Sequence, residues 1–346
     1  MNNPRKSASF NGTIRMSDVA RVAGVSLVTV SRAINQPDKL ATETLAAVQQ
    51  AITQLGYVPN LMAGSLASSR SRIIAAMVPT ISNLVFAETI EALTERLNAS
   101  GYQLLLAQTH YRQESEPHLL DTFLGRRVDG VVLLGDVRHT HAPQGPGPSI
   151  EQRLRESGIP VVQTWDLLPN PIDMQVGFSN FAVGQTAGNY LCQQGHRNIG
   201  FIGADEPRSH ARLQGLRSAV YAQGGTVFAA PTAPPAGIEA AAPQLTRLLQ
   251  QEAHFSAVFC NSDLLAAGVL FECRERGLNV PEQLAVMGLG DIPIAAAASP
   301  KITTIRLHRR QIGEITAQLL IDSLQNKSAR ETSIDIGFDI IQRASA

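Results

Sequence analysis

Residues 16–35 read MSDVARVAGVSLVTVSRAIN, and this stretch predicts two short helices joined by a tight turn. Ala20, Gly24 and Val30 stand at the positions where the two helices of such a motif touch. Ala20 is small enough to let the second helix approach, and Gly24 suits a turn residue with positive φ. In a helix-turn-helix the second helix lies in the major groove of DNA. The stretch therefore predicts DNA as a partner.

The residues that follow extend this pattern. A third helix is expected over 41–55, where leucine, valine and isoleucine recur at helical spacing. Gly56 ends that helix, and the segment GYVPN at 56–60 leads into LMAGSLASSRSR. This order of elements resembles the lactose-repressor (LacI) family of bacterial transcription regulators, and the resemblance covers nearly the whole chain.

The resemblance implies which side chains meet the DNA bases. Ser26 is a good N-cap for the second helix, and the apolar Leu27 and Val28 are expected to contact thymine methyl groups. The alternative for these two apolar residues is packing in the core of the head. Arg32 is the candidate for a guanine or a phosphate contact. The expected DNA-binding residues are Ser26, Leu27, Val28, Thr29, Ser31, Arg32, Asn60 and Leu66.

The segment after the third helix resembles the hinge helix of the family. In the family a leucine of this helix, Leu66 here, enters the minor groove and kinks the duplex. Gly64 and Ser65 are poor helix formers, which is typical of a helix that is marginal on its own. The alternative is a simple linker.

Charge and composition agree with a modular DNA-binding protein. Residues 1–72 hold eight Lys or Arg against three Asp or Glu, whereas the other residues hold 21 against 26. A basic head on an acidic body is the asymmetry expected of a DNA-binding module. The chain has no apolar run long enough to span a membrane, and its polar start lacks a signal core. A cytoplasmic location is therefore expected.

The body is expected to be an α/β structure. From residue 72, short β-rich runs alternate with helix-length stretches, which predicts a parallel sheet with helices on both faces. The alternation starts again near residue 173, so two doubly wound lobes of periplasmic-binding-protein type are expected, and the resemblance implies three chain crossings between them. The expected divisions are a head at 1–60, a hinge helix and linker at 61–72, a first lobe at about 73–172 plus 304–325, and a second lobe at about 173–303 plus 326–346.

Polar side chains at strand ends are the candidates for a ligand site. Ligands of open α/β sheets bind beyond the carboxyl ends of the strands. Arg212, in RLQG, resembles the arginine of the family's RxxG segment, which contacts the effector. The expected effector-binding residues are Asn83, Phe86, Trp165, Asp166, Arg208, Arg212, Asn261, Asp263 and Asp291. For Asp166 and Asp263 a role as a helix cap is the alternative, and for Arg212 the alternative is a structural ion pair.

Two departures from the family's pattern bear on the ligand. The usual Asn-Asp pair reads Ser262-Asp263 here, with Asn261 displaced by one residue, and Gly290 stands in place of one of two acids. Loss of an acid beside retained arginines favours an anionic ligand, because arginine binds carboxylates bidentately. Phrases such as VFCNSDLLAAG at 258–268 are similar to the gluconate-utilisation repressors of the family. The resemblance thus implies gluconate or a related sugar acid as the effector.

No catalytic motif is present. The chain has no GxSxG, no Walker A motif, no HExxH, no CxxC pair and no GxGxxG after a strand, so no enzyme activity, cofactor or metal is expected. A homodimeric repressor under the control of a small ligand is expected. The sequence leaves open a sugar-binding protein without gene control, and a family member that answers to another sugar, a co-repressor or a partner phosphoprotein. It also leaves open whether the ligand weakens or strengthens DNA binding.

Overall fold

The computed structural model describes residues 14–58, 70–135, 148–251, 254–326 and 331–346. The chain divides into two compact units, residues 1–71 and 72–346, which are taken one at a time below. In the described part of the chain, no helix combines the length and the apolar character needed to cross a membrane.

The first unit is a small helical head. It contains α1 (Met16–Ala23), α2 (Leu27–Asn35), a short 3-10 turn at Pro37–Lys39 and α3 (Thr42–Leu55). Gly24 ends α1 with φ 66°, and its N–H binds the carbonyl of Ala20. Ala20 and Val30 are buried in the core of the head, which confirms the helix contacts expected from the sequence. The same core holds Val19, Val48, Ala51 and Tyr57.

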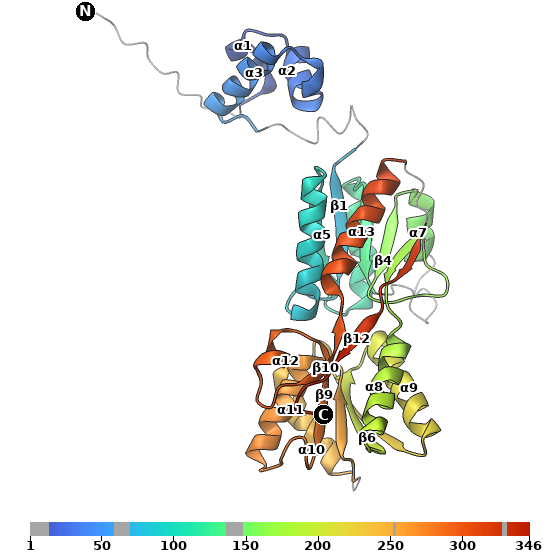
Figure 1. The fold of residues 1–346 in the computed structure, drawn as a ribbon. Coiled ribbons are helices and arrows are strands. Elements are labelled where there is room, and N and C mark those ends of the chain that lie inside the picture. The colour runs from blue at the N-terminus through green and yellow to red at the C-terminus, as the bar shows by residue number, and fades with distance from the viewer. Residues whose placement is uncertain (1–13, 59–69, 136–147, 252–253, 327–330) are drawn as a thin grey trace, which may run out of the picture. The chain divides into compact units, whose positions relative to one another are not determined.

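The second unit has two lobes, each built on a six-stranded sheet (Figure 1). The first sheet is parallel throughout, in the order β11-β5-β4-β3-β1-β2. Helices α5 and α13 lie side by side on one face, and α6 and α7 belong to the other. The elements are β1 (Ile73–Val78), η2 (Leu84–Phe86), α5 (Ala87–Ala99), β2 (Gln103–Gln108), η3 (Gln113–Ser115), α6 (Glu116–Gly125), β3 (Gly130–Leu134), α7 (Ile150–Ser157), β4 (Val161–Thr164), β5 (Met174–Gly177), α13 (Arg309–Leu324) and β11 (Ser333–Asp335).

The second lobe repeats this plan. Its sheet has the order β12-β10-β9-β8-β6-β7, and only the pair of β10 with β12 is antiparallel. Helices α8 and α9 cover one face, and α10 and α11 cover the other (Figure 1). The elements are α8 (Asn180–Gln193), β6 (Asn198–Ala204), α9 (Pro207–Ala222), β7 (Thr226–Thr232), η4 (Ile238–Ala240), α10 (Ala241–Leu249), β8 (Ala257–Cys260), α11 (Asp263–Glu275), β9 (Ala285–Gly290), α12 (Pro293–Ala297), β10 (Thr303–Leu307) and β12 (Phe338–Ile341).

The boundary between the lobes differs from the expected one. The strand at 174–177 was assigned to the second lobe, but it pairs with β4 in the first sheet, and the tail strand at 333–335 pairs with it. The chain therefore crosses between the lobes after β5, after β10 and after β11. A strand buried on both faces carries no alternation that says which sheet it joins, so the sequence pattern could not show this.

One helix start and one whole helix also differ from expectation. The helix expected from residue 210 begins one turn earlier, at Pro207, where Glu206 caps it and proline occupies a first-turn position. This earlier start places Arg208 and Arg212 on one helix, a single turn apart. Helix α7 was not expected at all. The sequence pattern had shown only the Pro/Gly-rich stretch before it, most of which lies outside the described residues.

Candidate functional site

A cavity of about 50 Å³ lies between the two lobes, at the ends of their strands. Both lobes contribute to its wall, so a molecule bound there would touch both. Six of the nine expected effector-binding residues line it: Asn83, Phe86, Trp165, Arg208, Arg212 and Asn261. Two further polar side chains of the wall, Tyr111 and Glu206, were not expected from the sequence.

Two aromatic rings from the first lobe form one part of the wall. The ring centroids of Phe86 and Trp165 lie 4.8 Å apart at an interplanar angle of 78°, an edge-to-face contact. Both side chains are almost completely buried. The indole Nε1 of Trp165 is also buried and has no hydrogen-bond partner within the described structure. An indole N–H can only donate, so this donor is unused within the described structure.

Arg212 supplies a positive charge that no carboxylate neutralises directly. Its Nε donates to the Asn180 side-chain oxygen at 2.8 Å, and its Nη1 donates to that of Asn261 at 2.7 Å. Both partners are uncharged amides, and Arg212 forms no ion pair with any described carboxylate. Burial lowers the pKa of Arg212 to about 10, so its guanidinium stays protonated at neutral pH. The two amides hold the guanidinium in place and leave it able to bind an anion.

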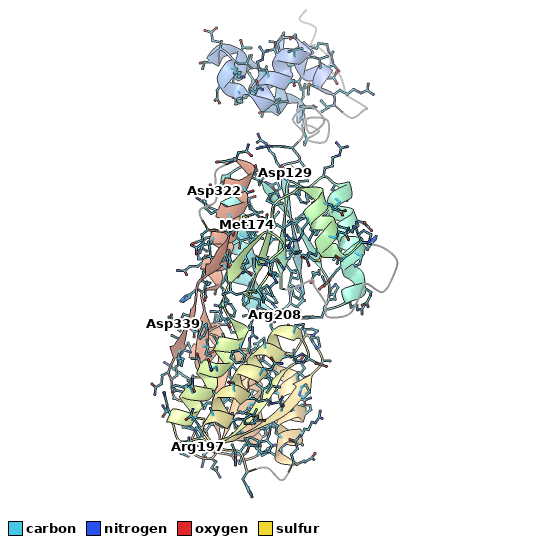
Figure 2. All side chains as sticks on the ribbon, turned by 90° about the vertical axis from the view of Figure 1, so that its right-hand side faces the viewer. Asp129, Met174, Arg197, Arg208, Asp322 and Asp339 are labelled. Carbon is cyan, nitrogen blue, oxygen red and sulfur yellow. The ribbon has the colours of Figure 1, made fainter. Side chains whose placement is uncertain are left out.

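Arg208 differs from Arg212 because its charge is compensated. Its Nε lies 3.1 Å from a carboxylate oxygen of Glu206, and its guanidinium carbon lies 5.3 Å from the ring centroid of Phe86. Glu206 also accepts a hydrogen bond from the backbone N–H of Ser209, which caps α9. Burial alone would raise the pKa of Glu206, but the two neighbouring arginines hold it below its ordinary value. Figure 2 shows Arg208 at the level where the two lobes face each other.

Asp166 faces a second cavity, of about 150 Å³, that adjoins the first. Its carboxylate accepts a hydrogen bond of 2.9 Å from the backbone N–H of Leu167. Burial raises its pKa, although Asn180 and the nearby arginines act in the opposite direction. Asp166 therefore contributes to the space between the lobes, beside the cavity that holds Arg212.

The other two expected acids bind groups of their own lobe. Asp263 is completely buried and accepts hydrogen bonds from the Thr304 hydroxyl at 2.5 Å and the Ile292 N–H at 2.8 Å. Burial raises the pKa of Asp263 to about 6. Asp291 forms ion pairs with Arg306 at 2.8 Å and with Arg343 at 2.6 Å.

The placement of these two acids differs from the site expected from the sequence. Neither side chain is part of the described lining of the cavity. The backbone after β9 turns through left-handed conformations, with φ 124° at Gly290 and φ 53° at Asp291. The carboxylate of Asp291 meets two arginines of the second lobe. A motif shows that a residue lies near a strand end, but the local backbone decides where its side chain points.

The head presents an apolar surface at the start of α2. Leu27 is 51% exposed and Val28 is 66% exposed, so these side chains do not belong to the core of the head. Ser26 caps α2 by accepting a hydrogen bond of 3.1 Å from the Thr29 N–H. Arg32 is exposed on the same helix, whereas Thr29 and Ser31 are half-buried. Two other expected DNA-binding residues, Asn60 and Leu66, lie outside the described residues.

Comparisons with known proteins cover both units. Residues 15–60 match the model for bacterial regulatory proteins of the lacI family, and residues 189–346 match the model for a periplasmic binding protein-like domain. The chain is 33% identical to the HTH-type transcriptional regulator GntR of Pseudomonas aeruginosa, with 98% of each chain covered. It is 32% identical to the HTH-type transcriptional repressor CytR of Escherichia coli, with 95% of each chain covered. A lacI-family transcriptional regulator from Silicibacter pomeroyi has a similar crystal structure, with a TM-score of 0.86 at 27% identity over 96% of this chain and 99% of that one.

Proposed function

Since the chain belongs to the lacI family of bacterial regulatory proteins and is a DNA-binding transcriptional regulator, we propose that it is a repressor controlled by a small sugar acid. The acid binds between the lobes of residues 72–346, and the head binds operator DNA. Its relatives in the comparisons are transcriptional regulators, and enzyme activity forms no part of the proposal.

One observation carries the choice of an acid as the ligand. Arg212 is a buried cation held by two neutral amides, so a carboxylate is the partner that would complete its interactions. The rings of Phe86 and Trp165 offer an apolar surface to the carbon chain of a sugar acid.

Gluconate is the proposed member of this class. The sequence phrases similar to gluconate-utilisation repressors support it, and so does the overall similarity to GntR. Overall identity alone does not select the effector, because identity to CytR is nearly the same. The acidic nature of the ligand therefore rests on the cavity. The proposed effector-binding residues are Asn83, Phe86, Tyr111, Trp165, Asp166, Glu206, Arg208, Arg212 and Asn261.

The proposed DNA contacts are made by the exposed residues at the start of α2. Leu27 and Val28 offer methyl groups to the major groove, and Ser26, Thr29, Ser31 and Arg32 offer polar groups to bases or phosphates. A homodimer would present two such helices to half-sites about one helical turn apart. Operator DNA as the partner implies action in the cytoplasm.

The proposed control is a shift between two arrangements of the lobes. A ligand that touches both lobes stabilises the arrangement in which both lobes contact the ligand. The ligand can shift the equilibrium only as far as its affinities for the two arrangements differ. Coupling of this kind changes affinity by about 5- to 150-fold. We propose that gluconate weakens operator binding within this range.

Fluorescence anisotropy with the full-length protein tests the proposal. Genomic fragments selected by the protein are titrated with and without gluconate. We expect a selected fragment to bind more tightly than random duplex, and gluconate to lower its affinity about fivefold or more. The proposal fails if no fragment is preferred to random duplex, or if gluconate leaves the affinity of the preferred fragment unchanged.

A further inference from the structure

Three arginines lie together at one edge of the first lobe. Arg72 comes directly before β1, and Arg126 and Arg127 lie between α6 and β3. Strands β1 and β3 are neighbours, and the N–H of Arg72 donates a hydrogen bond of 2.9 Å to the carboxylate of Asp129, which follows Arg127 closely in the chain. Figure 2 shows Asp129 at the end of the first lobe that faces away from the second lobe. The three arginines therefore share one surface, the arginine edge, at the opposite ends of the strands from the effector cavity.

The arginine edge carries positive charge that no ion pair compensates. All three side chains are exposed, and none of them forms an ion pair with a described carboxylate. Asp129 is only 8% exposed, and its carboxylate holds the backbone N–H of Arg72. The exposed acids at the same end of the lobe, Glu156 and Asp173, lie beside β4 and β5, farther along the sheet. The basic part of this end is therefore confined to β1 and β3, on a body that has more acids than bases.

Two of these arginines occupy a backbone conformation that favours glycine. The φ angle is 57° at Arg72 and 51° at Arg127. A side chain in this left-handed region costs free energy that glycine does not incur. Neither guanidinium forms an ion pair with a described carboxylate that would offset this cost. Residues held in such conformations concentrate at functional sites, so the two side chains point to a role beyond the stability of the lobe.

We propose that the arginine edge binds the phosphate backbone of the DNA that the head recognises. This goes beyond the proposed function, which assigns the DNA contacts to the head. A guanidinium pairs with phosphate oxygens, and such contacts add affinity without reading the base sequence. Arg72 lies 14 residues after Val58, the last described residue of the head before this segment, and that length of chain reaches at most about 50 Å. The chain thus keeps the arginine edge close to DNA bound by the head, at a high effective concentration.

Fluorescence anisotropy with the full-length protein at several salt concentrations tests the inference. The variant combines Arg126→Gln with Arg127→Gln, which removes two charges from the arginine edge. Each phosphate contact contributes about 0.9 to the slope of log affinity against log salt concentration, because it releases a counterion. We expect the double variant to reduce this slope by about one to two and to bind about 5- to 50-fold more weakly at low salt. A selected genomic fragment and random duplex should lose affinity alike, because phosphate contacts carry no sequence information.

The matched control combines Arg247→Gln with Arg274→Gln. Both are exposed arginines of the second lobe, on α10 and α11, so the net charge changes by the same amount, and we expect the salt slope to stay the same. A further variant separates DNA contact from stability. Arg127→Gly removes the guanidinium and suits the left-handed backbone, so the unfolding temperature should stay the same or rise while DNA affinity falls.

The outcomes separate this inference from the proposed function. An unchanged salt slope in the double variant, with the selected fragment still preferred, would overturn the arginine edge as a DNA contact and leave the role of the head in place. Equal changes in the edge and control variants would also overturn it, because net charge alone would then explain the effect. A lower unfolding temperature in Arg127→Gly would overturn the role of Arg127. If the unmodified protein prefers no fragment, the proposed function fails, and the salt slope on random duplex still decides the inference.

Discussion

The guanidinium of Arg309, in the first lobe, donates a hydrogen bond to the carbonyl oxygen of Gly290, in the second. The same side chain is held within its own lobe by two hydrogen bonds to the Glu88 carboxylate, at 3.2 and 2.7 Å. Arg309 is the first residue of α13, directly after a crossing between the lobes, and it is buried. This arginine thus links the lobes beside the cavity without being part of its described lining.

Loss of this link should weaken ligand binding. In Arg309→Gln we expect the gluconate Kd to rise about three- to tenfold. The reason is that the arrangement in which both lobes contact the ligand loses the charge-assisted hydrogen bond from Arg309 to the Gly290 carbonyl. The matched control is Arg310→Gln on the same helix, because Arg310 pairs with Glu95 and Glu314 inside the first lobe. Calorimetry with gluconate measures both variants. Equal changes in the two would contradict a role for the link between the lobes.

Arg212→Gln should separate the ligand response from DNA binding. The substitution removes the charge proposed to bind the effector, so we expect gluconate affinity to fall about 10- to 100-fold, while operator affinity without ligand stays within about twofold. Operator anisotropy at increasing gluconate concentration measures the response. Arg274→Gln, an exposed position on α11, serves as the charge-matched control. A normal response in Arg212→Gln would exclude Arg212 from the site.

Two valines of α2 should behave in opposite ways. Val28 is 66% exposed, so Val28→Ala should leave the stability of the head unchanged and weaken specific operator binding more than binding to random duplex. Val30 is fully buried, so Val30→Ala should destabilise the head by about 2 kcal/mol. Thermal unfolding and anisotropy on both duplexes measure these effects. Equal losses on specific and random DNA for Val28→Ala would count against base contact by this side chain.

The stability of the second unit should depend on the ionisation of Asp263. Burial raises the pKa of Asp263 to about 6 from its ordinary value of 3.8, the nearby Asp291 also raises it, and the hydrogen bond from Thr304 acts in the opposite direction. A raised pKa means that the unfolded chain releases this proton at lower pH than the folded one. The contribution of Asp263 to stability is therefore fully present below pH 4 and is lost as the pH rises towards 6.

Denaturant unfolding between pH 4 and 7.5 measures this dependence. The difference in unfolding free energy between the unmodified protein and Asp263→Asn should fall as the pH rises to 6 and then stay constant. The control is Asp121→Asn, which removes a carboxylate that is 61% exposed and pairs with Arg153 at the surface of the first lobe. A flat difference for Asp263→Asn over the whole range would show that the folded and unfolded pKa values of Asp263 are the same.

Local patterns in the sequence were enough to predict the head. The contact of Ala20 with the second helix, the left-handed turn at Gly24 and the burial of Val30 all depend on residues close together in the chain. The exposure of Leu27 and Val28 follows from the same local helix geometry, because the inward positions of α2 were already occupied. A short helical motif determines its own packing to a large extent, and so its sequence is informative.

The ligand site was only partly predictable. Arg212 and Asn261 stand in recognisable sequence segments. In the structure, Nη1 of Arg212 lies 2.7 Å from the side-chain oxygen of Asn261. Tyr111 was missed because it lies in a loop with φ 59°, a conformation that no pattern in the sequence announced. Glu206 had a signal, since an acid before a proline is typical of a helix start, and that signal would have placed it beside Arg208.

By itself, the order of residues determined the class of each part: a helical head, and a body of alternating strands and helices with polar groups at the strand ends. Only the tertiary structure decided that the strand at 174–177 belongs to the first sheet, that Asp263 and Asp291 bind groups of their own lobe, and that Arg212 lacks an acidic partner. The physical reason is that periodicity and caps arise within a few residues of chain. The hydrogen bonds of a buried side chain can join residues as distant in the chain as Arg212 and Asn261, which meet only when two strands and their helices pack together.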